Sequence, residues 1–347
     1  MAGPSAPLPS PKLPAARAIR RVEVVSTSRL FMADLISAVS RSFSVVMSKQ
    51  TTLEPMGTLG KIAAGTFVAG AATLAYASLI ERNMFTLRRY DVPVLTPEAE
   101  PLRLLHISDL HLTPHQMRKQ RWVNALAGLD PDLVVVTGDN LAHPEAVPAV
   151  LAAYDDLLGL PGAFVFGSND YTGPVWKNPF TYFNKDREYQ HGVDLPYEDL
   201  RTALTDAGWV DLNNNRALIK AGGRVIDLAG VDDPHIFRDE YPQGPADPQA
   251  DVRVALAHAP EPRVLDAFAT DGFDLLLAGH THGGQVRVPG VGALVTNCGL
   301  DRRMARGLHR WRGGSWLHVS AGIGTHPTAP VRFACRPEAS LLTLVPR

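Results

Sequence analysis

The stretch DLLLAGHTHGG, residues 274–284, places two histidines between glycines directly after an apolar run. The run Leu275–Ala278 is short, unbroken and followed by turn residues, which is typical of a buried strand in a parallel sheet. A strand followed by a glycine turn presents His280 and His282 at the carboxyl edge of the sheet, where open α/β sheets bind their ligands. Two ordinary polar loop histidines would look the same in isolation, so the rest of the chain must decide.

Five more apolar runs of the same kind occur between residues 102 and 258, and each ends in polar residues or a turn. They are LRLLHIS, DLVVVTG, AFVFGS, RVIDLAGV and VRVALAH. Segments with helical spacing lie at 116–129, 145–158, 197–207 and 261–269. This alternation predicts an α/β fold. Later apolar runs without intervening helices predict antiparallel additions to a mixed sheet, around 284–288, 293–296, 316–320 and 331–335.

The composition indicates a folded, nearly neutral chain. Of its 347 residues, 45% are hydrophobic and 20% are charged, which allows a sizeable core. The formal net charge of -1 argues against a broadly basic nucleic-acid-binding protein, so no nucleic-acid partner is expected. Two cysteines, Cys298 and Cys335, are too few for a disulfide framework or a cysteine-based zinc cluster.

Residues 1–60 differ in composition from the rest of the chain. They are rich in Pro, Ala, Ser and Arg, and the first fifty carry seven Lys or Arg against two acids. We expect a flexible basic tail, or a stretch that precedes a true start at Met47 or Met56. Residues 82–101 are expected to be a linker to the main domain, 102–347.

An uncharged apolar segment covers residues 62–80, between Lys61 and Glu81. Nineteen residues just span the hydrocarbon core of a bilayer, whereas a helix of a soluble domain normally shows a polar face. We therefore expect a transmembrane or signal-anchor helix over 61–81 and a single-pass protein of the cell membrane. A cleaved signal segment, with a small-residue site at 75–77, and a buried soluble helix are the alternatives. Positive charges are balanced on the two sides, so the orientation stays open.

Carboxylates, amides and imidazoles follow five of the predicted strands. They are Asp109, His111, Asp139, Asn140, Asn169, Asp170, His258, His280 and His282. Because the carboxyl ends of parallel strands meet at one edge of a sheet, these side chains are expected to lie together. Oxygen and nitrogen ligands without thiolates favour zinc, iron or manganese over copper(I).

The spacing of the D-x-H and H-x-H motifs suits a metal centre. On an extended segment alternate residues point the same way, so Asp109 and His111 are expected to converge on one ion. The same reasoning applies to His280 and His282. A pair of dications about 3.5–4 Å apart needs a bridging carboxylate between them. The sequence therefore predicts a site for two divalent ions, with manganese, iron or zinc as the candidates.

The ordered motifs resemble those of the calcineurin-like metallophosphoesterases, most closely a membrane-anchored or exported bacterial-type subgroup. The resemblance covers about residues 102–345 and rests on five blocks: DLH at 109–111, GDN at 138–140, GSND at 167–170, the lone His258 and GHTH at 279–282. It implies a four-layer α/β/β/α sandwich of two mixed sheets, preceded by one N-terminal hydrophobic helix.

The resemblance also implies a ligand set and an activity. One ion would be held by Asp109, His111 and His282, the other by His258 and His280, with Asp139 as the bridge. The implied reaction is hydrolysis of a phosphomonoester, phosphodiester or pyrophosphate by metal-activated hydroxide. Asp139 and His282 are expected to act in catalysis, together with Asn169.

The chain departs from the family pattern where GSND, residues 167–170, replaces GNHD. Position by position, Ser168 replaces a ligand asparagine, and Asn169 replaces a histidine that assists the phosphoryl group or the leaving oxygen. Either Asn169 is the seventh metal ligand or Ser168 coordinates weakly; we expect Asn169, since a carbonyl oxygen is the better donor to a hard cation. An amide cannot deliver a proton, so other histidines are candidate acids. These are His143, His191 and His235.

The segment 171–200 combines seven aromatic residues with Lys177, Lys185 and Arg187. It is expected to be either a lid that meets a membrane surface and phosphate, or an insertion that packs on its own domain. Together with the anchor, it favours a phospholipid or lipid-linked phosphate as the phosphate-ester substrate. The alternative function is a catalytically weakened metal-binding membrane protein. A nuclease fits poorly, while diesterase activity on cyclic nucleotides stays open.

Overall fold

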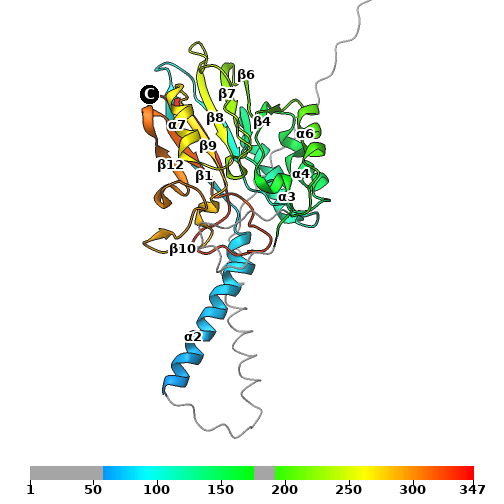
Figure 1. The fold of residues 1–347 in the computed structure, drawn as a ribbon, viewed down its shortest axis with the longest axis vertical. Coiled ribbons are helices and arrows are strands. Elements are labelled where there is room, and N and C mark those ends of the chain that lie inside the picture. Colours follow the sequence, from blue (N-terminus) through cyan, green and yellow to red (C-terminus); the bar gives the residue numbers. More distant parts are fainter. Residues whose placement is uncertain (1–57, 176–191) are drawn as a thin grey trace, which may run out of the picture. The chain divides into compact units, whose positions relative to one another are not determined.

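The computed structural model describes residues 58–175 and 192–347 (Figure 1). Residues 66–347 form one compact unit. The predicted tail therefore lies outside the described residues up to residue 57, and its last three residues belong to the first described helix. The central part of the predicted lid, 176–191, also lies outside them.

The apolar N-terminal segment forms a helix, as predicted. Helix α2 spans Thr58–Ala75 and continues through a π-helical turn, Tyr76–Ile80, and a 3-10 turn, Glu81–Asn83. By length and composition, Thr58–Asn83 can cross a membrane, with a mean hydropathy of 1.5 over its most apolar window. Only 6% of that window is buried, so it is not a core helix of the described protein. The alternative of a buried soluble helix was therefore wrong.

Two six-stranded mixed sheets form the domain, in the orders β1-β14-β2-β3-β4-β5 and β12-β13-β9-β8-β7-β6. The first sheet contains β1 (Thr86–Leu95), β14 (Glu338–Pro346), β2 (Leu102–Ile107), β3 (Leu133–Val136), β4 (Gly162–Phe164) and β5 (Val210–Asp211). The second contains β12 (Gly307–Arg310), β13 (Trp316–Val319), β9 (Leu275–Ala278), β8 (Val252–Ala257), β7 (Arg224–Gly230) and β6 (Asn215–Ala221). Strands β2, β3 and β4 are parallel, and so are β7, β8 and β9.

Alternation along the strands divides the interior into three cores. In β3, Leu133 and Val135 join the core between the two sheets, while Val134 and Val136 join the core beneath the helices. Helices α3 (Met117–Asn124), α4 (Val147–Tyr154) and α6 (Tyr197–Asp206) cover the first sheet, and α7 (Pro262–Thr270) covers the second. Figure 1 shows α7 and the other three helices on opposite sides of the strands. The four-layer α/β/β/α sandwich is confirmed.

The sequence of α7 explains its position on the outer face of the second sheet. Pro262 occupies the first turn, where the missing N–H costs nothing and the fixed φ suits a helix. Val264, Leu265 and Phe268 follow at helical spacing and are buried in the third core with Leu276 of β9.

Predictions for the chain between and after the main strands were partly wrong. The linker predicted for 82–101 contains β1, which pairs in parallel with β14. Its charged residues, typical of an edge strand, hide the strand pattern. The run 316–320 forms β13, which is parallel to β9 on one side and antiparallel to β12 on the other, so the expected antiparallel addition is confirmed at this edge. The run 331–335 forms only an isolated bridge at Phe333. The antiparallel pair β10 (Arg287–Val288) and β11 (Gly292–Ala293) forms a separate two-stranded sheet.

Candidate metal centre

The carboxyl ends of five strands from both sheets meet at one site. Asp109 and His111 follow β2, Asp139 follows β3, Asn169 follows β4, His258 follows β8, and His280 and His282 follow β9. The contacts described below connect all seven predicted ligands. This is the expected outcome of parallel strands whose polar residues begin where the apolar runs end.

Four of these residues form a compact group. Ligand atoms of Asp109, His111, Asp139 and His282 all lie within 4.8 Å of one another. His111 Nε2 lies 3.1 Å from His282 Nε2 and 3.4 Å from Asp139 Oδ2. His282 Nε2 lies 3.5 Å from Asp109 Oδ1. Two imidazole nitrogens and two carboxylates around one point fit a divalent transition-metal ion.

The backbone produces this convergence in a different way from the prediction. Asp109, His111, Asp139, His280 and His282 all have positive φ, between 42° and 66°, and are not extended. Such conformations cost on the order of 1–3 kcal/mol each in residues other than glycine, and they cluster at functional sites. The extended-segment interpretation was therefore wrong. His280 does not converge with His282 but packs edge-on against His258, with ring centroids 5.2 Å apart.

Burial keeps the imidazoles of the compact group neutral. It lowers the pKa of His111 to about 3 and that of His282 well below its usual value. Both rings therefore offer lone pairs at neutral pH, as metal binding requires. The pKa of Asp109 is raised to about 6, chiefly by burial, because a carboxylate in an apolar interior is stable only beside a positive charge. A cation among these side chains would supply that charge.

His258, which lies outside the compact group of four, also faces the carboxylate of Asp139. Its Nδ1 lies 2.6 Å from the Thr137 carbonyl oxygen, which can only accept, so Nδ1 carries the proton. The Nε2 lone pair then lies 3.4 Å from Asp139 Oδ2, and this buried atom has no hydrogen-bond partner among the described residues. Burial disfavours the charged ring, yet the Asp139 carboxylate outweighs it and raises the pKa of His258 well above its usual value. Two facing acceptors require a proton or a metal ion between them.

The GSND turn places Asn169 against the same carboxylate. Helix α5 (Ser168–Tyr171) begins there, and the Asn169 backbone N–H donates to Asp139 Oδ1 at 2.8 Å. The Asn169 amide Nδ2 donates to Asp139 Oδ2, also at 2.8 Å. Ser168 Oγ lies 3.5 Å from that Nδ2. Both candidate ligands of the motif are therefore at the site, and Asn169 is the one in contact with Asp139.

The carboxylate of Asp170 holds the GSND turn, residues 167–170, against the end of β3. This buried carboxylate accepts the backbone N–H groups of Asp139, Asn140, Leu141 and Gly167 at 2.7–3.2 Å. Gly138 makes the approach possible, since it has φ of 86° and a Cβ there would collide with the Gly167 backbone. The ends of β3 and β4 are thereby held together with Asp139 between them.

A directed chain of hydrogen bonds holds Asp109. Ser108 Oγ donates to Asp109 Oδ2 at 2.6 Å, and Thr137 Oγ1 donates to Ser108 Oγ at 2.8 Å. Thr137 must then accept from His106 Nε2, at 2.9 Å, which leaves His106 Nδ1 to accept from His318 Nδ1, also at 2.9 Å. Burial lowers the pKa of both imidazoles, so both are neutral. The chain crosses the core between the sheets and orients the carboxylate.

The sequence interpretation missed three residues at the site. Arg332 is fully buried and donates through Nη1 to the His282 carbonyl oxygen at 3.2 Å. Asp233 is fully buried after β7, at the same edge as the ligands, and accepts the His235 backbone N–H. The His326 ring lies 6.2 Å from that of His111. Only Asp233 had a usable signal, because it follows a predicted strand.

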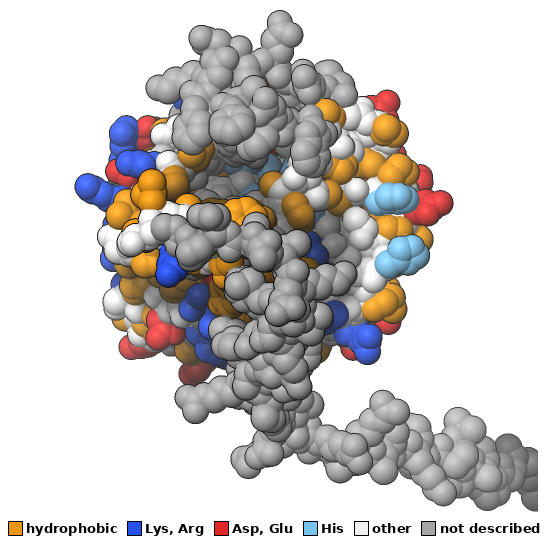
Figure 2. All heavy atoms as spheres, turned by 90° about the horizontal axis from the view of Figure 1, so that it is seen from below, with side chains coloured by type: hydrophobic (Ala, Val, Ile, Leu, Met, Phe, Trp, Pro, Cys, Tyr) orange, Lys and Arg blue, Asp and Glu red, His pale blue; other side chains and the backbone are white. Residues whose placement is uncertain are grey.

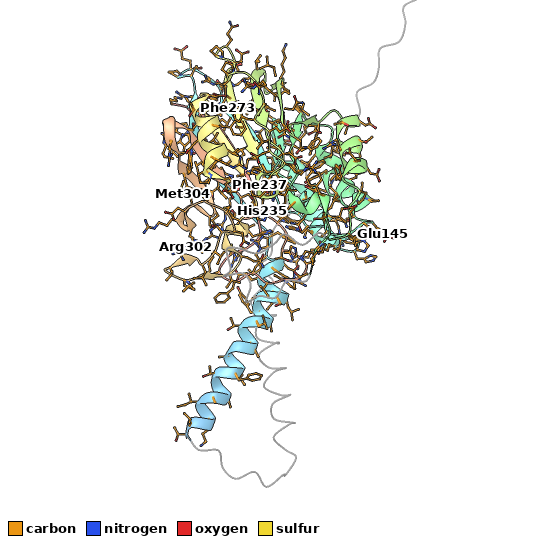
Figure 3. All side chains as sticks on the ribbon, in the orientation of Figure 1. Glu145, His235, Phe237, Phe273, Arg302 and Met304 are labelled. Atoms are coloured by element: carbon orange, nitrogen blue, oxygen red, sulfur yellow. The ribbon has the colours of Figure 1, made fainter. Side chains whose placement is uncertain are left out.

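The three candidate acids have different positions. The His235 ring lies 4.5 Å from that of His280, so it borders the site. His143 Nδ1 accepts from the Glu145 backbone, and Figure 3 shows Glu145 at the edge of the domain, far from His235. His191 lies outside the described residues.

Comparison with known proteins agrees with this geometry. The family model described as "Calcineurin-like phosphoesterase" matches residues 102–284. The chain is 26% identical to "Phosphodiesterase YaeI" of Escherichia coli over 80% of the chain and 95% of the relative. It is also 26% identical to "Uncharacterized metallophosphoesterase YkuE" of Bacillus subtilis, covering 86% and 98%. A zebrafish "Transmembrane protein with metallophosphoesterase domain" is 27% identical, covering 73% of the chain and 56% of that protein.

The matched range begins at β2 and ends in the glycine turn after His282, so it contains the ends of all five ligand-bearing strands. The group of four side chains whose geometry could hold a metal ion lies within it. The predicted enzyme class, a metal-dependent phosphoesterase, is confirmed. The chain belongs to the calcineurin-like phosphoesterase family.

Proposed function

We propose that the protein hydrolyses a phosphodiester at a centre of two divalent ions, and that it does so at the cell membrane. The observation that carries the proposal is the group of four ligand atoms within 4.8 Å, at strand ends that match the family model. Preference for a diester is supported by the phosphodiesterase among the relatives.

In this proposal Asp139 is shared by the two ions. Asp109, His111 and His282 complete the first set of ligands, and Asn169, His258 and His280 complete the second. When bound, the ions would neutralise the phosphoryl oxygens and lower the pKa of a coordinated water. The unpartnered His258 Nε2 supports the second position, because a metal ion would satisfy it.

The remaining side chains keep this geometry and handle protons. Asp170 and the Ser108–Thr137–His106 chain hold the two central carboxylates in fixed orientations. Asn169 can donate a hydrogen bond to a phosphoryl oxygen but cannot protonate a leaving group. We assign that proton to His235, whose ring lies 4.5 Å from that of His280 and is tilted against it by 47°.

Membrane attachment is supported by the helix Thr58–Asn83 and by the transmembrane relative. A single-pass anchor through residues 62–80 would hold the centre near lipid headgroups. A phospholipid or lipid-linked phosphate is therefore the proposed substrate class.

Metal dependence tests the activity. The purified full chain, stripped with EDTA, should hydrolyse neither p-nitrophenyl phosphate nor bis(p-nitrophenyl) phosphate, and added manganese should restore turnover, most strongly on the diester. Tight binding of manganese without turnover on any phosphate ester would instead support a catalytically weakened metal-binding protein. The GSND turn motivates that second candidate.

A further inference from the structure

A cavity of about 230 Å³ lies where the apolar helix ends, beside the first turn of α3. Eleven residues from three segments of the chain line it, among them Arg82, Asn83, Phe85, Met117, Arg118 and Lys119. None of the seven expected metal ligands is among them. The cavity is therefore distinct from the metal centre.

The lining of the cavity contains basic side chains and no acidic ones. Arg82 and Arg118 contribute two cations and Lys119 a third basic group, and no Asp or Glu is among the lining residues. Burial lowers the pKa of Lys119 to about 7, so its amine is only partly charged at neutral pH and gains full charge beside an anion. Within 58–175 and 192–347, none of the three forms an ion pair with an acid. The buried Arg82 Nε has no hydrogen-bond partner there. Uncompensated positive charge in a confined space repels itself, and an anion would relieve the repulsion.

Two further features favour an oxygen-rich anion. Gln116, which is the N-cap of α3, and residues 117–119 of its first turn line the cavity, so the positive end of the helix dipole adds to the basic side chains. Lys119 is buried and Nζ donates to the Leu110 carbonyl oxygen at 2.6 Å, which fixes its position. Guanidinium groups form charge-assisted, bidentate hydrogen bonds with phosphate.

We infer that this cavity binds a phosphate group, and that the phosphate belongs to the headgroup of a membrane phospholipid. The choice of a lipid rests on the proposed membrane anchor. Arg82 and Asn83 are both lining residues and the last residues of the apolar helix Thr58–Asn83, so the chain itself places the cavity at headgroup level. Phe85 and the half-exposed Met117 add apolar contacts for the glycerol part of a lipid.

Lys119 and the segment 323–325 link the cavity to the metal centre. Lys119 Nζ contacts the carbonyl oxygens of Leu110 and His111, and the Gly324 N–H donates to that of Asp109. Figure 2 shows hydrophobic, basic, acidic and histidine side chains mixed on the part of one face of the molecule that is not grey.

The test measures lipid binding by the full chain in detergent. EDTA is present throughout, so that the metal centre cannot hold phosphate. Three probes are compared: dioctanoyl phosphatidylglycerol, dioctanoylglycerol, which lacks the phosphate, and inorganic phosphate. We expect saturable binding of the phosphatidylglycerol only. The R82Q/R118Q variant should raise its Kd by roughly tenfold or more, and R118Q alone, at an exposed residue, by a smaller factor.

The matched control is R121Q, which removes the same charge from α3 outside the cavity and should leave the Kd unchanged. An equal loss in R121Q, or equal binding of dioctanoylglycerol, would overturn the proposal. Equal binding of inorganic phosphate would assign the cavity to a soluble anion and overturn the lipid source. D139N protein should still bind the lipid, so failure of the proposed hydrolysis and failure of this inference are distinguishable.

Discussion

The candidate metal centre has two sides, which meet at Asp139: the first contains Asp109, His111 and His282, and the second contains His258, His280 and Asn169. The two sides differ in how closely their ligand atoms approach one another. Asp109, His111 and His282 lie on one side of Asp139, and ligand atoms of these four residues lie within 4.8 Å of one another. The other side contains His258, His280 and the turn with Ser168 and Asn169, where the expected ligand stays open between those two residues. We therefore expect the first side to hold an ion whatever the second side does. Changes on the second side should alter proton transfer and the affinity for one ion.

The largest expected effect is at Asp139, which the two sides share. D139N keeps the shape of the side chain but removes the charge that would bridge two cations, so turnover should fall by on the order of 10²–10³-fold or more. Metal content, measured by mass spectrometry of the elements, should fall with it. D130N, in an exposed left-handed turn that suits asparagine, is the control. Equal activity of D139N and D130N would disprove the shared role.

His235 should separate chemistry from metal binding on the second side. H235Q should lower turnover of a dialkyl phosphodiester by roughly 10²-fold, because an alkoxide leaving group needs a proton. Turnover of bis(p-nitrophenyl) phosphate should change far less, since nitrophenolate leaves without one. H143Q is the control, at a histidine away from the site. An equal loss on both substrates would show that His235 is not the acid.

Substitutions of Asn169 and Ser168 test which of the two residues contributes to the affinity for the second ion. N169A should lower the affinity for the second ion by roughly 10–100-fold, whether Asn169 coordinates that ion or only orients Asp139. S168A should have the smaller effect. Calorimetric titration with manganese measures both. Two tightly bound ions in N169A together with one in S168A would assign the coordination to Ser168.

The smallest expected effect is on stability and concerns the row of hydrogen bonds from His318 through His106, Thr137 and Ser108 to Asp109. Burial lowers the pKa of His106 to about 3 and that of His318 well below 6.5, while both histidines of the unfolded chain take up protons below about pH 6.5. The unfolded state thus binds more protons between pH 4 and 6, and stability is lost as the pH falls through that window.

Asn at position 318 can still donate to His106 Nδ1 but does not titrate. H318N should therefore reduce the pH dependence of the unfolding free energy by about 1.4 kcal/mol per pH unit between pH 4 and 6. Urea unfolding at several pH values measures it. An unchanged slope would mean that His318 is protonated in the folded protein as well, and would contradict the neutral ring assigned to it.

The sequence predicted the strands that carry the ligands because each combines an apolar run with polar residues at its end. That signal is local, and it located Asp109, Asp139 and His282 correctly at one edge. The positive φ values of the ligands have no such signal, since the same motif could be extended. The backbone is bent there by contacts between strands that sequence spacing does not describe.

Long-range pairing explains the remaining misses. Strand β1 is recognisable only through β14, some 250 residues later in the chain. The His106–His318 pair spans 212 residues and joins two sheets, so no window of sequence contains it. Arg332 resembled part of a strand because its apolar neighbours dominate the run.

The central claim is that Asp139 lies between two cations. The most direct test is an anomalous-scattering map from crystals of the manganese-loaded protein. The account predicts one peak among Asp109, His111, Asp139 and His282, and a second about 3.5–4 Å away on the His258 side. A map without a peak beside Asp139, or with ions bound only elsewhere, would contradict it.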